Sequence, residues 1–289
     1  MNGAQATGFW HNHLLRCPNR LLDLSSPKIM AILNITDDSF YAGSRTPSVS
    51  ESLRRAELYL QQGAAVLDVG GVSSRPGSQP IREEEELRRV IPVVAALCQN
   101  FPDAIISVDT WRARVAEEAV SAGASMINDI SAGRMDAALL PTVAQLRVPY
   151  VLMHMQGTPA TMQLNPQYTD VVQDIFAFLK DKLLELHALG IYDVLVDPGF
   201  GFGKSLHHNY RLLAHLSTFQ ALGCPMLVGL SRKSMAYRPL GLTPESALNA
   251  TTALHMIALQ QGARLLRVHD VAEAMHVIHL WELLHQEGA

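Results

Sequence analysis

The sequence predicts a closed α/β barrel of eight parallel strands, the (β/α)8 TIM barrel, preceded by an N-terminal arm. Eight short apolar runs recur along the 289 residues, and most of them end at a polar residue. Each run is followed by a loop and then by a helical pattern, an alternation typical of βα units. The chain length suits one barrel of this kind. An open doubly wound sheet is the alternative, but eight units favour closure.

The predicted strands share branched apolar residues, as strands buried on both faces should. They are the runs 29–34, 65–70, 105–109, 125–129, 150–154, 194–197, 226–229 and 265–269. The carboxyl ends of barrel strands converge on one face, which carries the active site. The polar residues expected to meet there are Asn34, Asp109, Asn128, His154, Asp197, Arg267 and His269.

Helical patterns occupy most of the segments between these runs. Amphipathic or apolar-striped stretches predict helices over 50–62, 83–99, 112–122, 170–189, 209–221 and 247–261, with a further one over 272–284. Gly63, Gly123, Gly190 and Gly262 each follow a predicted helix and precede the next strand, as a left-handed helix end requires. We expect residues 1–25 to form the arm, which could be a hairpin that closes the barrel floor, and residues 26–289 to form one catalytic domain.

Composition limits the classes of partner. A formal net charge of −4 argues against nucleic acid, and an anionic ligand would need a local basic pocket. No apolar run is long enough to span a membrane, and the N-terminus lacks the pattern of a signal peptide. Cys17, Cys98 and Cys224 are scattered without a C-x-x-C spacing, which suggests thiols in a reducing compartment. The sequence therefore predicts a soluble cytoplasmic protein.

Two loops near the N-terminal strands carry candidate ligand-binding residues. In ILNITDDSFYAGSR (32–45), Asn34 could hold a ligand or a metal and Phe40 could form an aromatic wall; a turn with a helix cap is the alternative. In LDVGGVSSRPGS (67–78), two glycines admit a close ligand, and Ser73, Ser74 and Arg75 suit a phosphate. The alternative there is an ordinary turn with a solvated arginine.

The segment VDPGFGFGKS (196–205) resembles a phosphate loop, but its glycine spacing is one residue too short. It leaves Asp197 at a strand end, where an isolated buried carboxylate would be costly. That carboxylate could accept two parallel N–H bonds from an amino-pyrimidinone edge, or it could cap a helix. Met153 on the preceding strand could lie against a flat ring, although core packing is the simpler interpretation.

The last two strands precede basic residues that suit an anion. VGLSRKS (228–234) supplies Lys233 and Ser234, and RVHD (267–270) places Arg267 and His269 on the same side of a strand. Loops after the last strands of barrels frequently bind phosphate. A structural ion pair of Arg267 and a packed core position for His269 are the alternatives. The pairs His11/His13 and His207/His208 lack the carboxylates that would make a metal site persuasive.

These motifs together resemble one family. LNITDDSF, GGVSSRPGS, ISVDT, INDI, MHMQGTP, DPGFGFGK, LSRKS and RVHDV, in this order between residues 28 and 276, are similar to dihydropteroate synthase. The resemblance implies a (β/α)8 barrel, a homodimer and the use of Mg²⁺. It implies the condensation of 6-hydroxymethyl-7,8-dihydropterin diphosphate with 4-aminobenzoate, which releases pyrophosphate and forms 7,8-dihydropteroate in folate biosynthesis.

The resemblance also implies roles for individual residues. Asp109, Asn128 and Asp197 would line the pterin slot with Lys233, and Met153 and Phe202 extend this substrate-binding set. Arg75, Arg267 and His269 would hold the diphosphate, with Mg²⁺ near Asn34; Lys233, Arg267 and His269 are the expected catalytic residues. The aminobenzoate pocket would take Phe40, Ser74, Pro76, Lys233 and Ser234.

The chain departs from the family pattern in two loops. Asp37 stands where the family has Pro, Ala42 replaces an Asp, and Val72 and Ser74 replace a Glu and a Thr. These changes bear on metal binding by the first loop, on aminobenzoate affinity and on sulfonamide sensitivity. A pterin-binding paralogue without turnover and a pterin-dependent methyltransferase are the competing functions.

Overall fold

The computed structural model describes residues 13–18, 20–35, 49–72 and 81–287, and it contains a closed barrel of eight parallel strands. The barrel order is β10-β3-β4-β5-β6-β7-β8-β9, so β10 closes the ring on β3. The strands are β3 (Lys28–Asn34), β4 (Val66–Gly70), β5 (Ile105–Asp109), β6 (Met126–Asp129), β7 (Tyr150–Met153), β8 (Val194–Asp197), β9 (Met226–Val228) and β10 (Ala263–Val268). Each predicted strand is present within two residues, and the predicted fold class is confirmed.

The barrel interior is divided along its axis into an apolar floor and a polar upper part. Successive strand residues face opposite sides, so every second residue points inward. The lower inward residues are all apolar and pack together: Met30, Val66, Ile105, Met126, Val151, Leu195, Leu227 and Leu265. Two residues further along their strands come Asp68, Asn128 and Arg267, among others. The outward residues pack instead against the surrounding helices.

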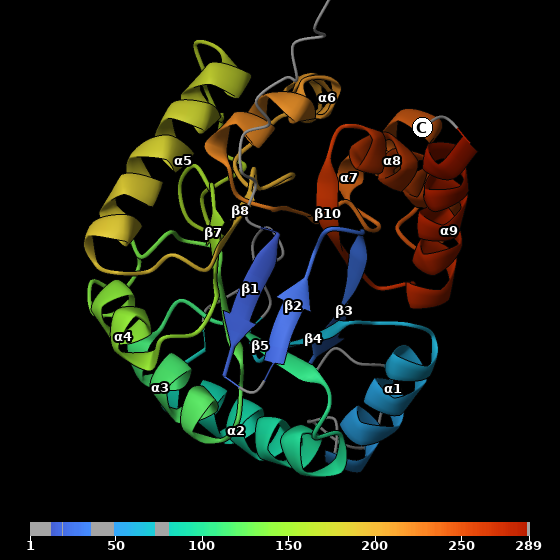
Figure 1. Cartoon of the computed structure of the whole chain (residues 1–289). Helices are drawn as coiled ribbons and strands as arrows, with labels where there is room; N and C mark the ends of the chain where they lie inside the picture. The colour runs from blue at the N-terminus through green and yellow to red at the C-terminus, as the bar shows by residue number, and fades with distance from the viewer. Residues whose placement is uncertain (1–12, 19, 36–48, 73–80, 288–289) are drawn as a thin grey trace, which may run out of the picture.

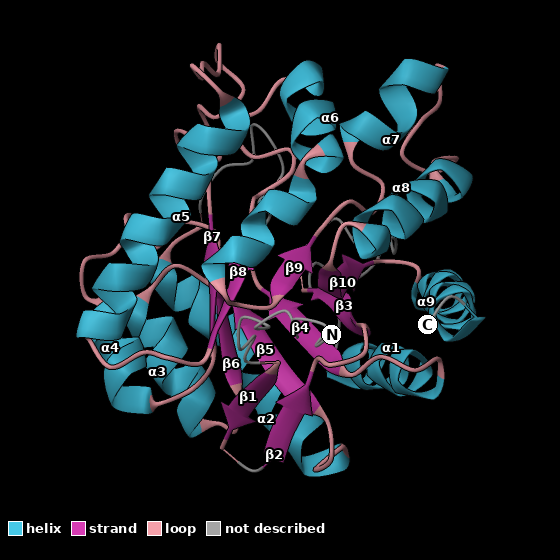
Figure 2. Ribbon diagram, turned by 45° about the horizontal axis from the view of Figure 1, so that its top comes forward, coloured by secondary structure: helices cyan, strands magenta, loops and turns pink. Residues whose placement is uncertain are grey.

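A short antiparallel hairpin covers the floor. Strands β1 (Leu14–Cys17) and β2 (Arg20–Asp23) pair with Leu15 opposite Leu22. Both leucines are buried and belong to the same apolar cluster as the lower inward residues of the barrel. The hairpin lies across the ring of strands in Figure 1 and at one end of the barrel in Figure 2. A floor-closing hairpin in the N-terminal arm is therefore confirmed.

Helices surround the barrel in the expected alternation (Figure 2). They are α1 (Val49–Gln61), α2 (Glu83–Asn100), α3 (Ala113–Ser121), α4 (Leu139–Leu146), α5 (Val171–Ala188), α6 (Leu206–Ala214), α7 (Ser234–Tyr237), α8 (Leu248–Gln260) and α9 (Val271–Glu287), with 3-10 turns at Leu216–Leu222 and Arg238–Leu240. Gly123 has φ +111°, and a Cβ there would lie 2.8 Å from Cys98 Sγ, so glycine is required at this helix end. Gly63, Gly190 and Gly262 also have positive φ, as predicted. In the described part of the chain, none of the helices has the length and apolar character needed to cross a bilayer.

Three helical segments differ from the prediction, and one of them is the four-residue helix α7, which was not predicted. The helix expected over 209–221 begins earlier, because Ser205 accepts from the His208 amide and forms a capping box. It ends at Ala214, and a 3-10 helix follows after His215. Helix α4 was not predicted. It has no side-chain cap at its start and ends at Arg147 with φ 55°, so the usual glycine signal is absent.

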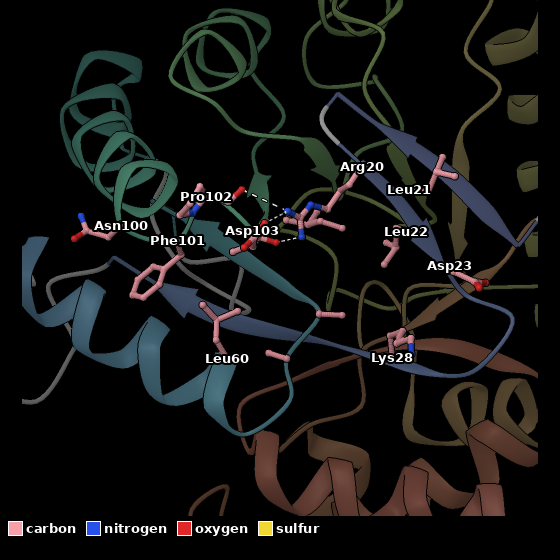
Figure 3. Close-up of a pocket in the computed structure, with 14 residues that line it drawn as sticks. Arg20, Leu21, Leu22, Asp23, Lys28, Leu60, Asn100, Phe101, Pro102 and Asp103 are labelled. Carbon is pink, nitrogen blue, oxygen red and sulfur yellow. Dashed lines mark hydrogen bonds and ion pairs between the residues drawn. The ribbon is translucent and has the colours of Figure 1, made fainter.

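A pocket of about 610 Å³ lies at the floor, between the hairpin and the loop after α2. Arg20 spans it: the guanidinium donates to Asp103 Oδ1 at 2.8 Å and to the Asp103 carbonyl (Figure 3). Ala65, directly before β4, and Ile105, the first residue of β5, also line the pocket. It is therefore at the opposite end of the barrel from the carboxyl ends of the strands.

Candidate active site

Residues from four strands form one hydrogen-bonded network inside the upper barrel. Arg267 Nε on β10 donates to Asp68 Oδ2 on β4 at 2.7 Å, and Arg267 Nη2 donates to Asp109 Oδ2 on β5 at 2.7 Å. Asn128 Nδ2 on β6 donates to the same oxygen of Asp68 at 3.0 Å. The predicted meeting of Asp109, Asn128 and Arg267 is confirmed. The ion-pair alternative for Arg267 is also present, with two aspartates.

Asp197 ends β8 with its carboxylate buried, at 5% exposure. Its Oδ1 accepts from the backbone N–H of Gly199 at 2.7 Å. Gly199 has φ +72°, and a Cβ there would lie 1.9 Å from the carbonyl oxygen of His154, so only glycine fits. Helix α6 starts much later and is capped by Ser205. The interpretation of Asp197 as a helix cap is therefore wrong.

The side chains of Asp68, Asp109, Asn128, Asp197, Lys233 and Arg267 lie in the upper interior of the barrel, which we call the cup. Lys233 can extend into the cup because Gly201 and Gly229, which lie beside it, have no side chains. A Cβ on Gly201 would lie 3.3 Å from Lys233 Cδ, and one on Gly229 would lie 3.6 Å from Lys233 Nζ. The ammonium donates to the carbonyl of Phe200 at 2.5 Å and lies 4.7 Å from the ring centroid of Phe202. No direct ion pair joins Lys233 to the described acids around it, Asp197 included. Its charge and that of Asp197 act on each other across the cup.

Burial shifts the pKa values of Asp109, Asp197 and Lys233 in the direction that favours the uncharged form of each side chain. Burial raises the pKa of Asp109 to about 7, although the adjacent Arg267 charge opposes this. Burial likewise raises the pKa of Asp197, against the opposing charge of Lys233. Burial lowers the pKa of Lys233 to about 8, and Asp197 partly offsets the shift. Perturbed titratable groups gathered in one cup are typical of functional sites.

An apolar wall adjoins the polar network. It is a cluster separate from the two larger cores and consists of Trp111, Ile130, Met153, Met155, Met162 and Phe202, with Val72 packed against it. Met153 and Phe202 thus belong to one cluster, and Phe202 lies next to the ammonium of Lys233. A flat heterocycle with polar edges would find both kinds of partner here.

Three further predicted residues lie at the carboxyl ends of strands or in the segments that follow them, which we call the rim of the cup. Asn34 ends β3, and a Cβ on Gly70 would lie 3.4 Å from Asn34 Oδ1 and 3.6 Å from Asp109 Cβ. His269 follows β10, and its Nδ1 lies 3.0 Å from Ser231 Oγ, which also accepts from the His269 backbone N–H at 3.2 Å. Ser234 is the first residue of α7, directly after Lys233. Phe40, Ser74, Arg75 and Pro76 lie outside the described residues.

His154 is packed rather than free to meet the other strand-end residues. Its ring makes an edge contact with Phe178 at 4.9 Å, and Nδ1 lies 3.0 Å from Lys204 Nζ. Burial lowers the pKa of His154 to about 2, with the Lys204 charge acting in the same direction. His154 is thus a neutral packed residue and does not belong to the polar network of the other strand-end residues.

Asp68 and Lys204 were missed by the sequence interpretation. The sequence predicts the run 65–70 as a strand with apolar residues on both faces, but Asp68 lies within it, fully buried, and joins Arg267 to Asn128. A charged residue in an apolar strand requires a partner, and that was the available signal. Lys204 is 2% exposed and donates to the carbonyls of Gly199 at 2.8 Å and Phe202 at 3.0 Å. It fixes the loop that follows Asp197.

Within the described ranges, three or more histidine, cysteine or acidic side chains nowhere gather as a metal cluster. Asn34 supplies an amide oxygen near the carboxylate of Asp109. Mg²⁺ prefers oxygen ligands and is commonly bound through one or two protein groups together with substrate phosphates. The donor set around Asn34 fits that mode of binding.

Comparison with known proteins agrees with this geometry. The profile of the pterin binding enzymes matches residues 30–269. This chain belongs to that family. It is 45% identical to the dihydropteroate synthase of Haemophilus influenzae over 266 residues, which cover 91% of this chain and 96% of the relative.

Solved structures extend the similarity to the fold. The Yersinia pestis dihydropteroate synthase in a sulfonamide drug complex has a TM-score of 0.90 and 43% identity, covering 94% of this chain and 99% of that one. The Xanthomonas albilineans enzyme in complex with 7,8-dihydropteroate has a TM-score of 0.84 and 40% identity, covering 94% and 98%. This member of the pterin-binding family is accordingly grouped with the dihydropteroate synthases.

Proposed function

We propose that this chain condenses 6-hydroxymethyl-7,8-dihydropterin diphosphate with 4-aminobenzoate, and releases pyrophosphate and 7,8-dihydropteroate for folate biosynthesis. The observation that carries the proposal is the cup in which Asp109, Asn128 and Asp197 face Lys233 and Arg267 beside an apolar wall. Relatives with this name cover nearly the whole chain, and a solved one contains the reaction product.

The cup matches the chemistry of a pterin ring. The ring presents an amino-amide edge of N–H donors, which suits the carboxylate of Asp197 and the acid and amide of Asp109 and Asn128. Its carbonyl and ring nitrogen are acceptors, which suit the ammonium of Lys233. Met153 and Phe202 supply the apolar surface against which a flat ring can lie. These are assignments that a mutational series can test one by one.

The reaction itself asks little acid–base chemistry of the protein. The dihydropterin donates electrons toward its exocyclic carbon, which weakens the C–O bond, and the departing pyrophosphate gains negative charge. Arg267 and His269, together with Arg75, would stabilise that charge. The amine of aminobenzoate then attacks the carbon, from a pocket to which we assign Phe40, Ser74, Pro76, Lys233 and Ser234.

We assign Asn34 as the protein ligand of Mg²⁺. Bound there, the ion would neutralise charge on the diphosphate. The assignment is tested by calorimetry with and without Mg²⁺: Asn34→Ala should abolish the part of the diphosphate affinity that depends on Mg²⁺. Equal Mg²⁺ dependence in the two proteins would remove Asn34 from the site.

The pterin assignment is tested at Asp197. Asp197→Ala should abolish measurable binding of the dihydropterin diphosphate in calorimetry, because the ring would lose its paired acceptor. Unchanged affinity would reject the slot. The activity as a whole is tested by complementation of a strain that lacks dihydropteroate synthase and by release of pyrophosphate from the two substrates. Failure of both would favour a non-catalytic pterin-binding paralogue or a pterin-dependent methyltransferase.

We also propose a homodimer that pairs through α8 and α9. These helices expose large apolar side chains, with Leu280, Leu283 and Leu284 at 57%, 57% and 59% exposure and Ile257 at 41%. Grouped apolar exposure of this kind marks an interaction surface. Light scattering should give twice the chain mass, and Leu283→Glu should halve the measured mass.

A cytoplasmic location is supported by the three cysteines, all of which are free thiols.

A further inference from the structure

Arg232 and Asp270 join the two loops that carry the basic end of the cup. Arg232 lies between Ser231 and Lys233 in the loop after β9, and Asp270 follows His269 in the loop after β10. Arg232 Nε donates to Asp270 Oδ2 at 2.9 Å, and Nη2 donates to Oδ1 at 2.8 Å. A two-point contact of this kind fixes orientation as well as distance. Neither residue has a role in the function proposed above.

The backbone at Arg232 is held in an unusual conformation. Its φ is +54°, in the left-handed region that L side chains rarely adopt. The turn is fixed by a bond from the Lys233 N–H to the Leu230 carbonyl at 3.2 Å and by one from the Arg232 N–H to Thr251 Oγ1 at 3.2 Å. Such strain persists only where the surroundings determine it. As a result, Arg232 reaches Asp270 on the neighbouring loop while Lys233 reaches the Phe200 carbonyl inside the cup.

The same guanidinium also holds the segment before α8. Nη1 donates to the carbonyls of Pro244 at 2.8 Å and Glu245 at 2.7 Å. Four donor contacts of one side chain therefore connect three segments. With side-chain exposures of 25% for Arg232 and 19% for Asp270, the pair is sheltered from water more than an ordinary surface ion pair.

The adjacent residues form a second link between the same two loops. Ser231 Oγ contacts both the backbone N–H and Nδ1 of His269. The links 231–269 and 232–270 are thus one residue apart on both loops. The ammonium of Lys233, in contrast, has its own contacts with Phe200 and Phe202, away from Asp270.

We propose that Arg232 and Asp270 are positioning residues that set the geometry of Ser231 and His269, the end of the cup that receives the diphosphate. The proposal rests on the proposed function, because it assigns His269 to the leaving group. Loss of the pair would let the two loops separate at Ser231 and His269. The slot for the pterin ring, formed by other strands and anchored at Lys233 independently, would keep its shape.

The test compares two ligands that differ only in the diphosphate. For Asp270→Asn, the affinity for 6-hydroxymethyl-7,8-dihydropterin should stay within twofold of wild type in calorimetry. The KM for the dihydropterin diphosphate should rise, and kcat should fall at least tenfold. Arg232→Gln should have the same effect. The double variant should lose no more than either single one, because the pair acts as a unit.

Asp193→Asn is the matched control. Asp193 accepts from the Arg16 backbone N–H at 2.9 Å and from Arg16 Nε at 3.2 Å. Its side chain is 17% exposed and that of Arg16 is 72% exposed, so it forms an ion pair at the barrel floor, remote from the cup. This variant should keep wild-type kinetics. Equal losses for both ligands, or additive losses in the double variant, would overturn the positioning role. A wild-type protein that releases no pyrophosphate would instead reject the proposed function.

Discussion

Asp68→Asn tests the residue on which the polar network depends. Asp68 is fully buried, and its Oδ2 accepts from both Arg267 and Asn128. Asparagine keeps the shape and one acceptor oxygen but removes the charge. The Asp68 Oδ1 atom has no partner among the described residues, so the new amide nitrogen can take its place without breaking an existing bond. The variant therefore removes the charge beside Arg267 while its remaining oxygen can still accept from Arg267 and Asn128.

The expected loss of stability follows from that single change. A hydrogen bond to a charged group contributes about 1.5–3 kcal/mol and a neutral one about 0.5–1.5 kcal/mol, so the free energy of unfolding should fall by about 1–2 kcal/mol. Arg267 retains its second pair with Asp109, which keeps the cost below the roughly 3–5 kcal/mol of leaving a buried charge alone. At about 2–4 °C per kcal/mol for a chain of this size class, Tm should fall by about 2–8 °C.

The variant should also lower activity. Arg267 loses one of the two carboxylates that orient it, and kcat/KM should fall at least tenfold, or about 1.4 kcal/mol. The pKa of Asp109 should also fall, since the Asp68 charge contributes to raising it. Pyrophosphate release and thermal unfolding provide the two measurements.

Asp129→Asn serves as the control for this variant. Asp129 is also fully buried, but it accepts from the Tyr150 hydroxyl at 2.7 Å and from two backbone amides instead of Arg267. It should lower Tm without lowering kcat/KM in proportion. Wild-type kcat/KM in Asp68→Asn, or an equal loss in the two variants, would refute the idea that Asp68 acts by orienting Arg267.

Two further predictions concern the same network. Arg267→Ala should reduce turnover more than tenfold, a barrier change above about 1.4 kcal/mol, because the departing pyrophosphate loses a cation; wild-type turnover would remove Arg267 from the mechanism. Asp109 should make the ligand-free protein less stable as pH rises from about 4 to about 7, because its pKa in the folded state lies above the unfolded value near 3.9. Its stabilising contribution is complete below the unfolded pKa and lost through the folded one. Asp109→Asn should accordingly flatten this part of the Tm profile, and an unchanged profile would contradict the assignment.

The apolar runs and the polar residues that end them sufficed to predict most of the fold. Parallel strands with residues alternating between two faces can be recognised from apolar runs alone, and the polar residue that ends each run then falls on one face. Asp109, Asn128 and Asp197 were located in this way. Helix α4 could not be, because it has no side-chain cap at its start and its C-cap, at φ 55°, is Arg147 instead of a glycine.

Inward-facing site residues that lie in the interior of a strand, two positions before its end, were harder to predict. Asp68 lies two residues before Gly70 on the same inward face, in the interior of a strand. Inspecting strand tips alone therefore misses it, whereas counting inward positions at period two would have exposed a buried carboxylate without a local partner. Lys204 was missed for a related reason: its contacts are backbone carbonyls brought close only by the folded loop.

The net charge of the cup explains why the described network alone cannot balance the negative charge of the diphosphate. Three buried carboxylates, Asp68, Asp109 and Asp197, face three basic side chains, Lys204, Lys233 and Arg267. Their formal charges cancel, and two guanidinium contacts of Arg267 are already taken by aspartates. A near-neutral cup suits the pterin ring, whose edges carry donors and acceptors but no charge. It cannot balance a diphosphate, and the chain as a whole is acidic. The roles proposed above for Arg75, His269 and a cation at Asn34 would supply the compensating charge.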